Sequence, residues 1–181
     1  ITFGFIEQDT TTYGGHIKVS DKSTLFGKNN MLTVGYLPDA GTTDGRTRSV
    51  GAGFVAGAVS AQTTQKSENH RFLLEDKFSI SDATILIGSL QYHQSNRKKD
   101  DSVNPASAYD IQYTQWIPRF GVIHNISSSH QIFANVSNNF EPPIFDVTST
   151  MLATKAQTEV SYEVGGRGET VFNNSRDHVF Y

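Results

Sequence analysis

Apolar and polar residues alternate along much of the chain with a period of two, which is the spacing of a β-strand. The clearest case lies between residues 157 and 168. One face of this segment carries Thr158, Val160, Tyr162 and Val164, and the other carries Gln157, Glu159, Ser161, Glu163 and Arg167. Such alternation indicates a sheet with one apolar and one polar face. The periodicity of a helix is hard to find, so the sequence predicts an all-β protein.

The predicted strands follow from this alternation and from the polar breaks between apolar segments. They cover residues 1–7, 13–20, 30–38, 46–62, 70–80, 83–94, 111–125, 130–140, 157–168 and 171–181. Consecutive strands of this kind pair as antiparallel hairpins. Nothing in the sequence marks a domain boundary, so we expect all of residues 1–181 to belong to one domain.

The predicted connections alternate in length. Short turns are predicted near Ser81-Asp82, at 127–129 and at 165–168, and long polar connections at 94–107 and 138–154. The alternation of faces fits a soluble sandwich, which is its commoner source, as well as a membrane barrel. Short turns at one end and long loops at the other favour a transmembrane barrel, whose strands need about 9–11 residues to cross the bilayer. The strands predicted at 83–94, 111–125 and 130–140 have this length.

Composition narrows the possible functions. The chain has no cysteine, which excludes disulfide scaffolds, cysteine zinc sites and thiol catalysis. Its formal net charge is -3. The basic run Arg97-Lys98-Lys99 is followed at once by Asp100 and Asp101, so it resembles a solvated loop more than a nucleic-acid surface. We therefore expect no nucleic acid among the partners.

Residue patterns that carry enzyme chemistry are missing from the sequence. There is no Gly-x-Ser-x-Gly nucleophile motif and no phosphate-binding loop. The 6 histidines are scattered, and none forms the helical pair spaced four residues apart that binds zinc in metalloproteases. Glu75 and Asp76 are neighbours in a predicted strand, so they point to opposite faces and cannot act as a pair of acids. The sequence predicts no catalytic residue, no metal site, no cofactor and no enzyme activity.

Several stretches, taken in order, resemble a known family. Residues 70–92 form an aromatic-rich strand with the acidic pair 75–76, a short turn, and a strand that ends Gly-x-x-x-Tyr. Residues 116–124 contain Pro-Arg-x-Gly, and 131–145 run from Phe-Ala-x-x-Ser into a segment with Pro-Pro. Residues 156–169 contain Tyr-Glu-x-Gly-x-x-Gly. In order and spacing these stretches are similar to the barrels of TonB-dependent outer-membrane receptors of the ferric-siderophore and ferric-citrate type.

The resemblance implies a fold and a place in the cell. Receptors of this kind have a plug domain inside a barrel of about 22 strands. Residues 1–181 would then be one part of an antiparallel transmembrane β-barrel, with the plug and the remaining strands outside this chain. The barrel would lie in the outer membrane of a Gram-negative bacterium, in contact with lipid and lipopolysaccharide.

The resemblance also implies a function and its partners. The expected function is energised uptake of an iron chelate, such as a siderophore or a ferric citrate-like complex. The expected partner is a TonB-type energy-coupling protein, acting through the plug. Two alternatives remain open at this point: a passive outer-membrane channel or small barrel, and a soluble β-rich binding domain.

Candidate site residues come from the long connections and from the polar face. Binding residues often lie on long loops carried by a rigid scaffold. The ligand-binding candidates are Arg97, Lys98, Lys99, Phe140 and Phe145. The residues expected to face the lumen are Arg119, Glu159, Glu163 and Arg167. The resemblance assigns the aromatic residues of the opposite face to the membrane interface.

Overall fold

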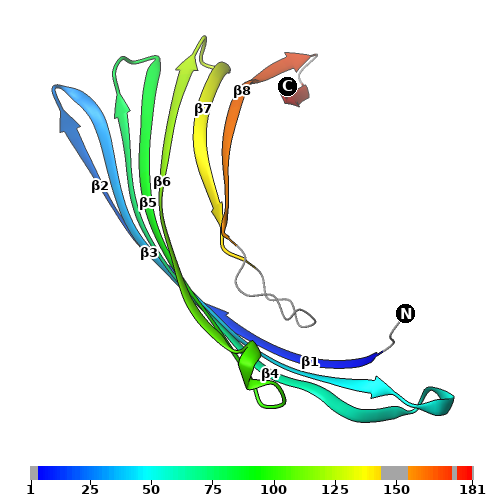
Figure 1. The fold of residues 1–181 in the computed structure, drawn as a ribbon. Helices are drawn as coiled ribbons and strands as arrows, with labels where there is room; N and C mark the ends of the chain where they lie inside the picture. The colour runs from blue at the N-terminus through cyan, green and yellow to red at the C-terminus, as the bar shows by residue number, and fades with distance from the viewer. Residues whose placement is uncertain (1–3, 144–154, 173–174, 181) are drawn as a thin grey trace.

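The computed structural model describes residues 4–143, 155–172 and 175–180 of the chain. Within these residues nine strands form one sheet, and every strand pair is antiparallel. The sheet curves into a trough with a concave and a convex face (Figure 1). Two short 3-10 helices, η1 (Ala52–Phe54) and η2 (Pro105–Ser107), lie between strands. The predicted all-β antiparallel fold is confirmed.

The order of the strands in the sheet follows the order in the sequence, apart from β2. The strands are β1 (Gly4–Gly14), β2 (Ile17–Leu25), β3 (Lys28–Val50), β4 (Ala56–Ser79), β5 (Thr84–Asp101), β6 (Tyr109–Asn125), β7 (His130–Glu141), β8 (Gln157–Phe172) and β9 (Ser175–Phe180). The sheet order is β1-β3-β4-β5-β6-β7-β8-β9. Strands β1 and β2 share β3 as their partner, β1 along its second half and β2 along its first.

Pro38 explains why β1 and β2 are separate strands. The carbonyl oxygen of Pro38 accepts a hydrogen bond from the backbone N–H of Gly15, at 3.1 Å. In an antiparallel strand the N–H and C=O of one residue point to the same side. Proline has no N–H, so β3 offers one donor fewer on this side. The ladder is interrupted here, and β1 ends at Gly14 while β2 begins at Ile17.

Apolar residues predominate on the convex face between the short turns and one aromatic row, and the acidic residues Asp21 and Asp76 lie among them beside Leu32. This row joins Tyr36, Phe72, Tyr92 and Trp116, which are cross-strand neighbours on β3 to β6. The ring centroids of Tyr36 and Phe72 lie 4.8 Å apart, and those of Tyr92 and Trp116 also lie 4.8 Å apart. Several side chains of this face are well exposed, including Phe72 at 49% and Trp116 at 57%. Such a band with an aromatic edge is typical of the lipid-facing surface of a barrel.

Beyond the aromatic row the convex face becomes polar. The next two cross-strand rows are Pro38, His70, Gln94 and Thr114, followed by Ala40, Glu68, Asn96 and Gln112. The apolar band of the convex face therefore ends at the aromatic row. Strands β3, β4, β5 and β6 continue well past it, as the long lower part of the sheet in Figure 1 shows.

The predicted strand at 46–62 is wrong, because a hairpin end lies inside it. Strand β3 ends at Val50 and β4 begins at Ala56. Between them Gly53 and Phe54 have φ angles of 75° and 59°, the left-handed conformation that a tight reversal requires. The segment is rich in glycine and alanine and carries no charge between residues 49 and 62, so its sequence gives no alternation from which to place the turn.

The long connection predicted at 94–107 is also wrong for most of its length. Strand β5 runs to Asp101 and pairs with β4 as far as Thr63 opposite Asp101. Only residues 102–108 connect β5 to β6. Asp101 closes this loop, because its carboxylate accepts hydrogen bonds from the backbone N–H groups of Val103 and Asn104, both at 3.0 Å. The pKa of Asp101 is lowered, since these bonds and one from Ser107 outweigh the effect of burial, which alone would raise it.

Two further predictions concern β7 and β8. The short turn predicted at 165–168 is wrong, because these glycines lie within β8, which continues to Phe172. Part of the connection predicted at 138–154 is strand, since β7 runs to Glu141. Residues 144–154 lie outside the part of the chain that the structure describes.

Candidate functional site

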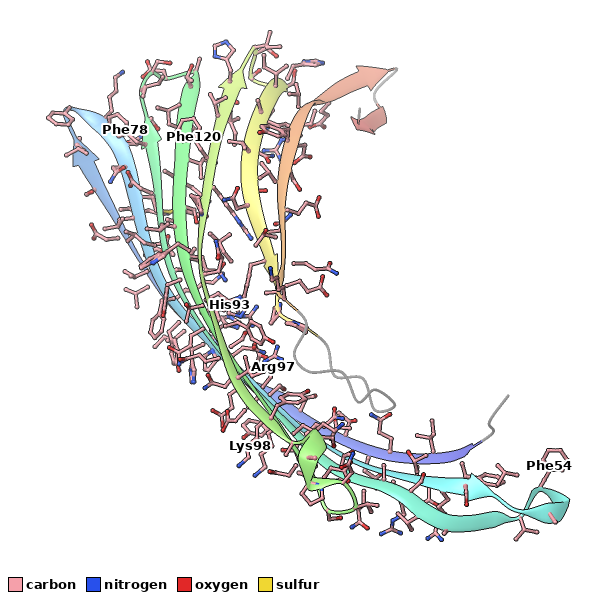
Figure 2. The ribbon with its side chains drawn as sticks, viewed as in Figure 1. Phe54, Phe78, His93, Arg97, Lys98 and Phe120 are labelled. Atoms are coloured by element: carbon pink, nitrogen blue, oxygen red, sulfur yellow. The ribbon has the colours of Figure 1, made fainter. Side chains whose placement is uncertain are left out.

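Polar side chains from three strands meet on the concave face, just beyond the level of the aromatic row. They lie in successive cross-strand positions of β3, β4 and β5. We call this group the concave network: Asp39, Asn69, Arg71, His93, Ser95 and Arg97. Figure 2 shows His93 and Arg97 on this side of β5. Three members are buried, with Ser95 completely enclosed.

A series of hydrogen bonds through Asn69 connects the carboxylate of Asp39 to the guanidinium of Arg97. Asp39 accepts hydrogen bonds from Arg71 Nη2 at 2.6 Å and from Asn69 Nδ2 at 2.5 Å. The other end of the same amide, Asn69 Oδ1, accepts from Ser95 Oγ at 2.6 Å and from Arg97 Nη1 at 3.0 Å. Because both ends of Asn69 are used, its amide holds the carboxylate and the guanidinium at a fixed separation.

His93 is held as a neutral donor beside this chain of bonds. Its Nε2 lies 3.0 Å from Ser95 Oγ. Ser95 gives its one hydroxyl hydrogen to Asn69, so the Nε2 of His93 must donate to the Ser95 oxygen. The pKa of His93 is lowered, first by burial and then by the positive charges of Arg71 and Arg97. The ring is therefore neutral at pH 7.

The end of β7 crosses onto this network. Strand β7 pairs with β6 only as far as Ser137, and beyond that point the two strands separate (Figure 1). The ring of Phe140 packs edge-on against His93, with centroids 5.1 Å apart and an interplanar angle of 79°. The carbonyl oxygen of Pro143 accepts a hydrogen bond from Arg97 Nε at 3.3 Å. Two contacts therefore fix residues 140–143 above the centre of the network.

The basic run at 97–99 is divided between the two faces. Arg97 and Lys99 are buried on the concave face, and burial lowers the pKa of Arg97, which nevertheless stays charged. Lys98 points to the convex side, where its Nζ lies 3.7 Å from a carboxylate oxygen of Asp100 (Figure 2). Gln65, the cross-strand neighbour of Lys99, is completely buried, and its side-chain amide has no hydrogen-bond partner among the described residues.

The residues expected to face the lumen lie on the concave side in the structure. Arg119 stands opposite Ser89 and Ser137. The remaining three, Glu159, Glu163 and Arg167, alternate along β8 with Val160, Tyr162 and Val164, of which Tyr162 is 81% exposed on the convex face. Cross-strand bonds hold two of them. Asn135 Nδ2 donates to Glu163 Oε2 at 2.6 Å, and Arg167 Nη2 donates to Gln131 Oε1 at 3.1 Å.

The structure brings together only part of the ligand set expected from the sequence. Arg97 and Phe140 both belong to one surface, and Lys99 lies next to it. Lys98 lies on the opposite face, and Phe145 falls outside the described residues. The other members of the network were missed. One signal for them exists in the sequence, because residues 93, 95, 97, 99 and 101 are all polar and share one face of a strand.

The described part of the chain contains neither a metal-binding cluster nor a long apolar helix. No group of three histidine, cysteine, aspartate or glutamate residues is placed there to hold a metal ion. No helix among the described residues is both long and apolar enough to span a membrane.

Comparison with known proteins identifies the family. The sequence model of the TonB dependent receptor-like β-barrel matches residues 2–179. The chain belongs to this family. No curated protein sequence matches it.

Solved receptor structures share the fold at low sequence identity. The unliganded ferric citrate transporter FecA superposes with a TM-score of 0.77 at 14% identity, over 91% of this chain and 26% of FecA. The alcaligin outer-membrane receptor FauA from Bordetella pertussis gives 0.69 at 16% identity, over 92% of this chain and 27% of FauA. The ferric preacinetobactin receptor BauA from Acinetobacter baumannii gives 0.70 at 13% identity, over 99% and 33%. The chain thus spans about a quarter to a third of the length of these TonB-dependent receptors.

Proposed function

We propose that this chain is part of the barrel of a TonB-dependent outer-membrane receptor that imports an anionic ferric chelate. The energy would come from a TonB-type coupling protein acting through a plug domain. Family membership and the likeness to barrels of ferric-chelate receptors support this proposal. Both the energised step and the ligand belong to the proposal, because those receptors are only 14% and 16% identical to this chain.

The concave network supports the choice of an anionic chelate. Arg71, Arg97 and Lys99 bring three cations to neighbouring positions, whereas the same surface carries the carboxylates of Asp39 and Asp101. Buried cations attract an anion more strongly than exposed ones, since less water screens them. Arginine suits carboxylate-rich ligands because its planar group donates two parallel hydrogen bonds. The single observation that carries the proposal is Arg97, which is buried, charged and held in place by Asn69 and Pro143.

The ring of Phe140, near the guanidinium of Arg97, adds an apolar contact for the ligand. Phe140 lies against His93 beside the cations, and large rigid rings give binding area at a low cost in conformational entropy. A chelate with carboxylates and an apolar backbone would meet both kinds of group here. The residues proposed for ligand contact are therefore Arg97, Lys99 and Phe140, on the concave face.

The test uses the full-length receptor that contains this chain, in a Gram-negative strain without other ferric-citrate receptors. Uptake of radiolabelled ferric citrate is measured for the unchanged receptor, for Arg97→Gln and for Lys98→Gln. We expect Arg97→Gln to reduce uptake about tenfold at low chelate concentration, as loss of a charged hydrogen bond implies. Lys98→Gln removes the same charge one residue away on the convex face, so uptake should be unchanged.

Two results would contradict the proposal. Uptake that continues after the proton-motive force is collapsed would indicate a passive channel. Equal uptake by the two variants would place the ligand away from the concave network. Surface amounts of each variant are measured in parallel, so that a loss of protein is not read as a loss of transport.

A further inference from the structure

A carboxylate stands at mid-height of the apolar band on the convex face. Asp76 lies in the cross-strand row that contains Gly88 and Phe120. Along the chain it is four residues from Phe72 in the aromatic row and four from Ile80 at the short turn, which is about 13–14 Å of strand in each direction. Asp76 is therefore equally far from the two edges of the band.

The carboxylate of Asp76 has no hydrogen-bond or ion-pair partner among the described residues, and its Oδ1 is enclosed. In the adjacent row Asn30 Oδ1 is enclosed without a partner as well. Between the short turns and the aromatic row, the described strands β2 to β8 place one lysine or arginine on this face. It is Lys28, whose Nζ lies 3.1 Å from Asp82 Oδ1. Lipid chains offer no donor, so an ionisable group at this depth is costly unless a partner pairs with it.

An open space the width of one side chain lies beside the carboxylate. Gly88 is the neighbour of Asp76 in the row, and a Cβ built on Gly88 would meet no atom within 4 Å. Phe120 stands on the other side of Gly88 and is 54% exposed (Figure 2). Because neighbouring strands lie about 4.8 Å apart, the backbones at Asp76 and Phe120 are separated by about 10 Å. We call this position the Gly88 gap.

The chemistry on the two sides of the Gly88 gap suits a cationic side chain. The carboxylate of Asp76 accepts charge-assisted hydrogen bonds from an ammonium or a guanidinium. The ring of Phe120 attracts a cation that lies over its face. Leu86 and Leu90 flank Gly88 on the same face of β5, and they offer apolar contacts to the methylene groups of a lysine or an arginine.

The depth of the gap determines what carries the cation. Lipid headgroups lie at the edges of the apolar band, so their amines do not reach the level of Asp76. In the hydrocarbon region a cation has to belong to a membrane-spanning helix or barrel. A second copy of this chain that met the surface with the same surface would bring acid against acid. Asp21 lies in the row of Asp76, and the row carries no lysine or arginine.

We propose that the Gly88 gap is a docking site for a second membrane-spanning protein, which inserts one lysine or arginine between Asp76 and Phe120. This inference rests on the membrane placement in the proposed function. Charge complementarity selects the partner, because the gap joins an unpaired carboxylate to an exposed aromatic ring within an apolar surface. The site is separate from the residues proposed for chelate contact, which lie on the concave face.

The first test uses the full-length receptor in the outer membrane of its own host, with photoreactive benzoyl-phenylalanine in place of Leu90. The peptide that becomes attached is sequenced by mass spectrometry. Asp76→Asn removes the charge with little change of shape, and Gly88→Leu fills the gap without a clash at its Cβ. Glu75→Gln is the matched control, because it removes the same charge one residue away on the concave face.

We expect a cross-link to a membrane-spanning segment that carries a lysine or arginine at the depth of the gap. Its yield should fall about tenfold in Asp76→Asn and in Gly88→Leu, which corresponds to about 1.4 kcal/mol, and should be unchanged in Glu75→Gln. The inference is overturned by attachment to lipid alone, by a segment without lysine or arginine, or by an equal yield in Asp76→Asn. Heat-dependent gel mobility shows that each barrel is folded.

A defined probe measures the charge preference directly. The purified full-length receptor is placed in lipid vesicles with a membrane-spanning peptide of leucine and alanine that has one central lysine, glutamine or aspartate, and association is followed by fluorescence energy transfer. We expect the unchanged receptor to prefer the lysine peptide to the glutamine peptide about tenfold, and Asp76→Lys to prefer the aspartate peptide. Absence of both preferences would overturn the inference. Absence of energised ferric citrate uptake by the unchanged receptor would count against the proposed function alone, since the charge preference does not depend on transport.

Discussion

Gly165 lies directly opposite Phe133 on the concave face, and the phenylalanine ring occupies the space where a side chain would stand. A Cβ built on Gly165 would lie 2.5 Å from Phe133 Cζ. The next glycine, Gly166, has the opposite orientation, and the atom nearest to a Cβ built there would be Gln131 O, at 3.6 Å. The packing of Phe133 therefore requires a glycine at position 165, whereas no close contact requires one at position 166.

This difference predicts opposite effects of the same substitution. Gly165→Ala should destabilise the folded receptor by about 1–3 kcal/mol, since the ring must move in a packed surface. Gly166→Ala should be neutral or stabilising by up to about 1 kcal/mol, because alanine restricts the unfolded chain. Urea unfolding of the full-length receptor in detergent, followed by circular dichroism, compares the two. A smaller loss for Gly165→Ala than for Gly166→Ala would refute the packing described here.

The assignment of the convex face to lipid predicts the cost of a buried charge. Val136 lies on the convex face in a row with Leu32, Asp76 and Phe120, whereas its neighbour Ser137 faces the concave side. Arginine on the lipid face near the bilayer midplane destabilises a barrel by about 2–4 kcal/mol. We therefore expect Val136→Arg to lower the free energy of unfolding in lipid vesicles by this amount, and Ser137→Arg to change it much less. Equal costs would mean that the two faces meet similar surroundings.

His93 should make the stability of the receptor depend on pH. Its pKa is lowered by burial and by two arginines, so the folded protein holds its proton less tightly than the unfolded chain does. Above the ordinary histidine pKa of about 6.5 the imidazole of His93 is neutral in both the folded and the unfolded state, so it does not make the free energy of unfolding depend on pH there. As the pH falls below that value the unfolded chain gains the proton first, and the free energy of unfolding decreases until the folded pKa is also passed.

The measurement compares urea unfolding at a pH of about 7.5 and about 5.5, on either side of the pKa of an unperturbed histidine. His93→Gln keeps a hydrogen-bond donor toward Ser95 but cannot titrate in this range. We expect part of the decrease at low pH to disappear in this variant. An identical decrease in both proteins would assign the pH dependence to other groups.

The sequence was sufficient to predict a strand where the two faces of that strand meet different surroundings. Along β8 as far as Val164, the apolar residues Val160, Tyr162 and Val164 share one face and polar residues the other, so this part of the strand and the face of each residue can be predicted. Past the aromatic row both faces are polar, as Gln94 and Ser95 illustrate, and the period of two disappears. For this reason the second half of β5 has the sequence of a loop although its backbone continues as a strand.

The concave network could not be predicted from the sequence, because it depends on how the strands are placed relative to one another. Asn69 and Arg97 are brought together by the register of β4 and β5, which the turn at 80–83 determines and which no local pattern reveals. Phe140 shares the alternation of Val136, so its sequence position predicts the convex face. It reaches His93 because β7 leaves β6 after Ser137, and that departure is a tertiary feature.

Asn69 is predicted to act on the chelate through Arg97, as a positioning residue. Its Oδ1 accepts from Arg97 while its Nδ2 donates to Asp39, so Asn69→Ala removes the link that holds the guanidinium. We expect the affinity of the full-length receptor for ferric citrate, measured by calorimetry, to fall about tenfold. Asn96→Ala is the matched control, because the Asn96 side chain lies on the convex face of the adjacent strand.

A double-mutant cycle separates positioning from a general loss of structure. If Asn69 acts through Arg97, then Asn69→Ala should have little further effect on affinity once Arg97→Gln is present, and the coupling between the two changes should approach the whole effect of Asn69→Ala. If the two losses simply add, Asn69 contributes independently of the guanidinium. That result would contradict the role assigned to Asn69, even though the network itself would still be present in the folded barrel.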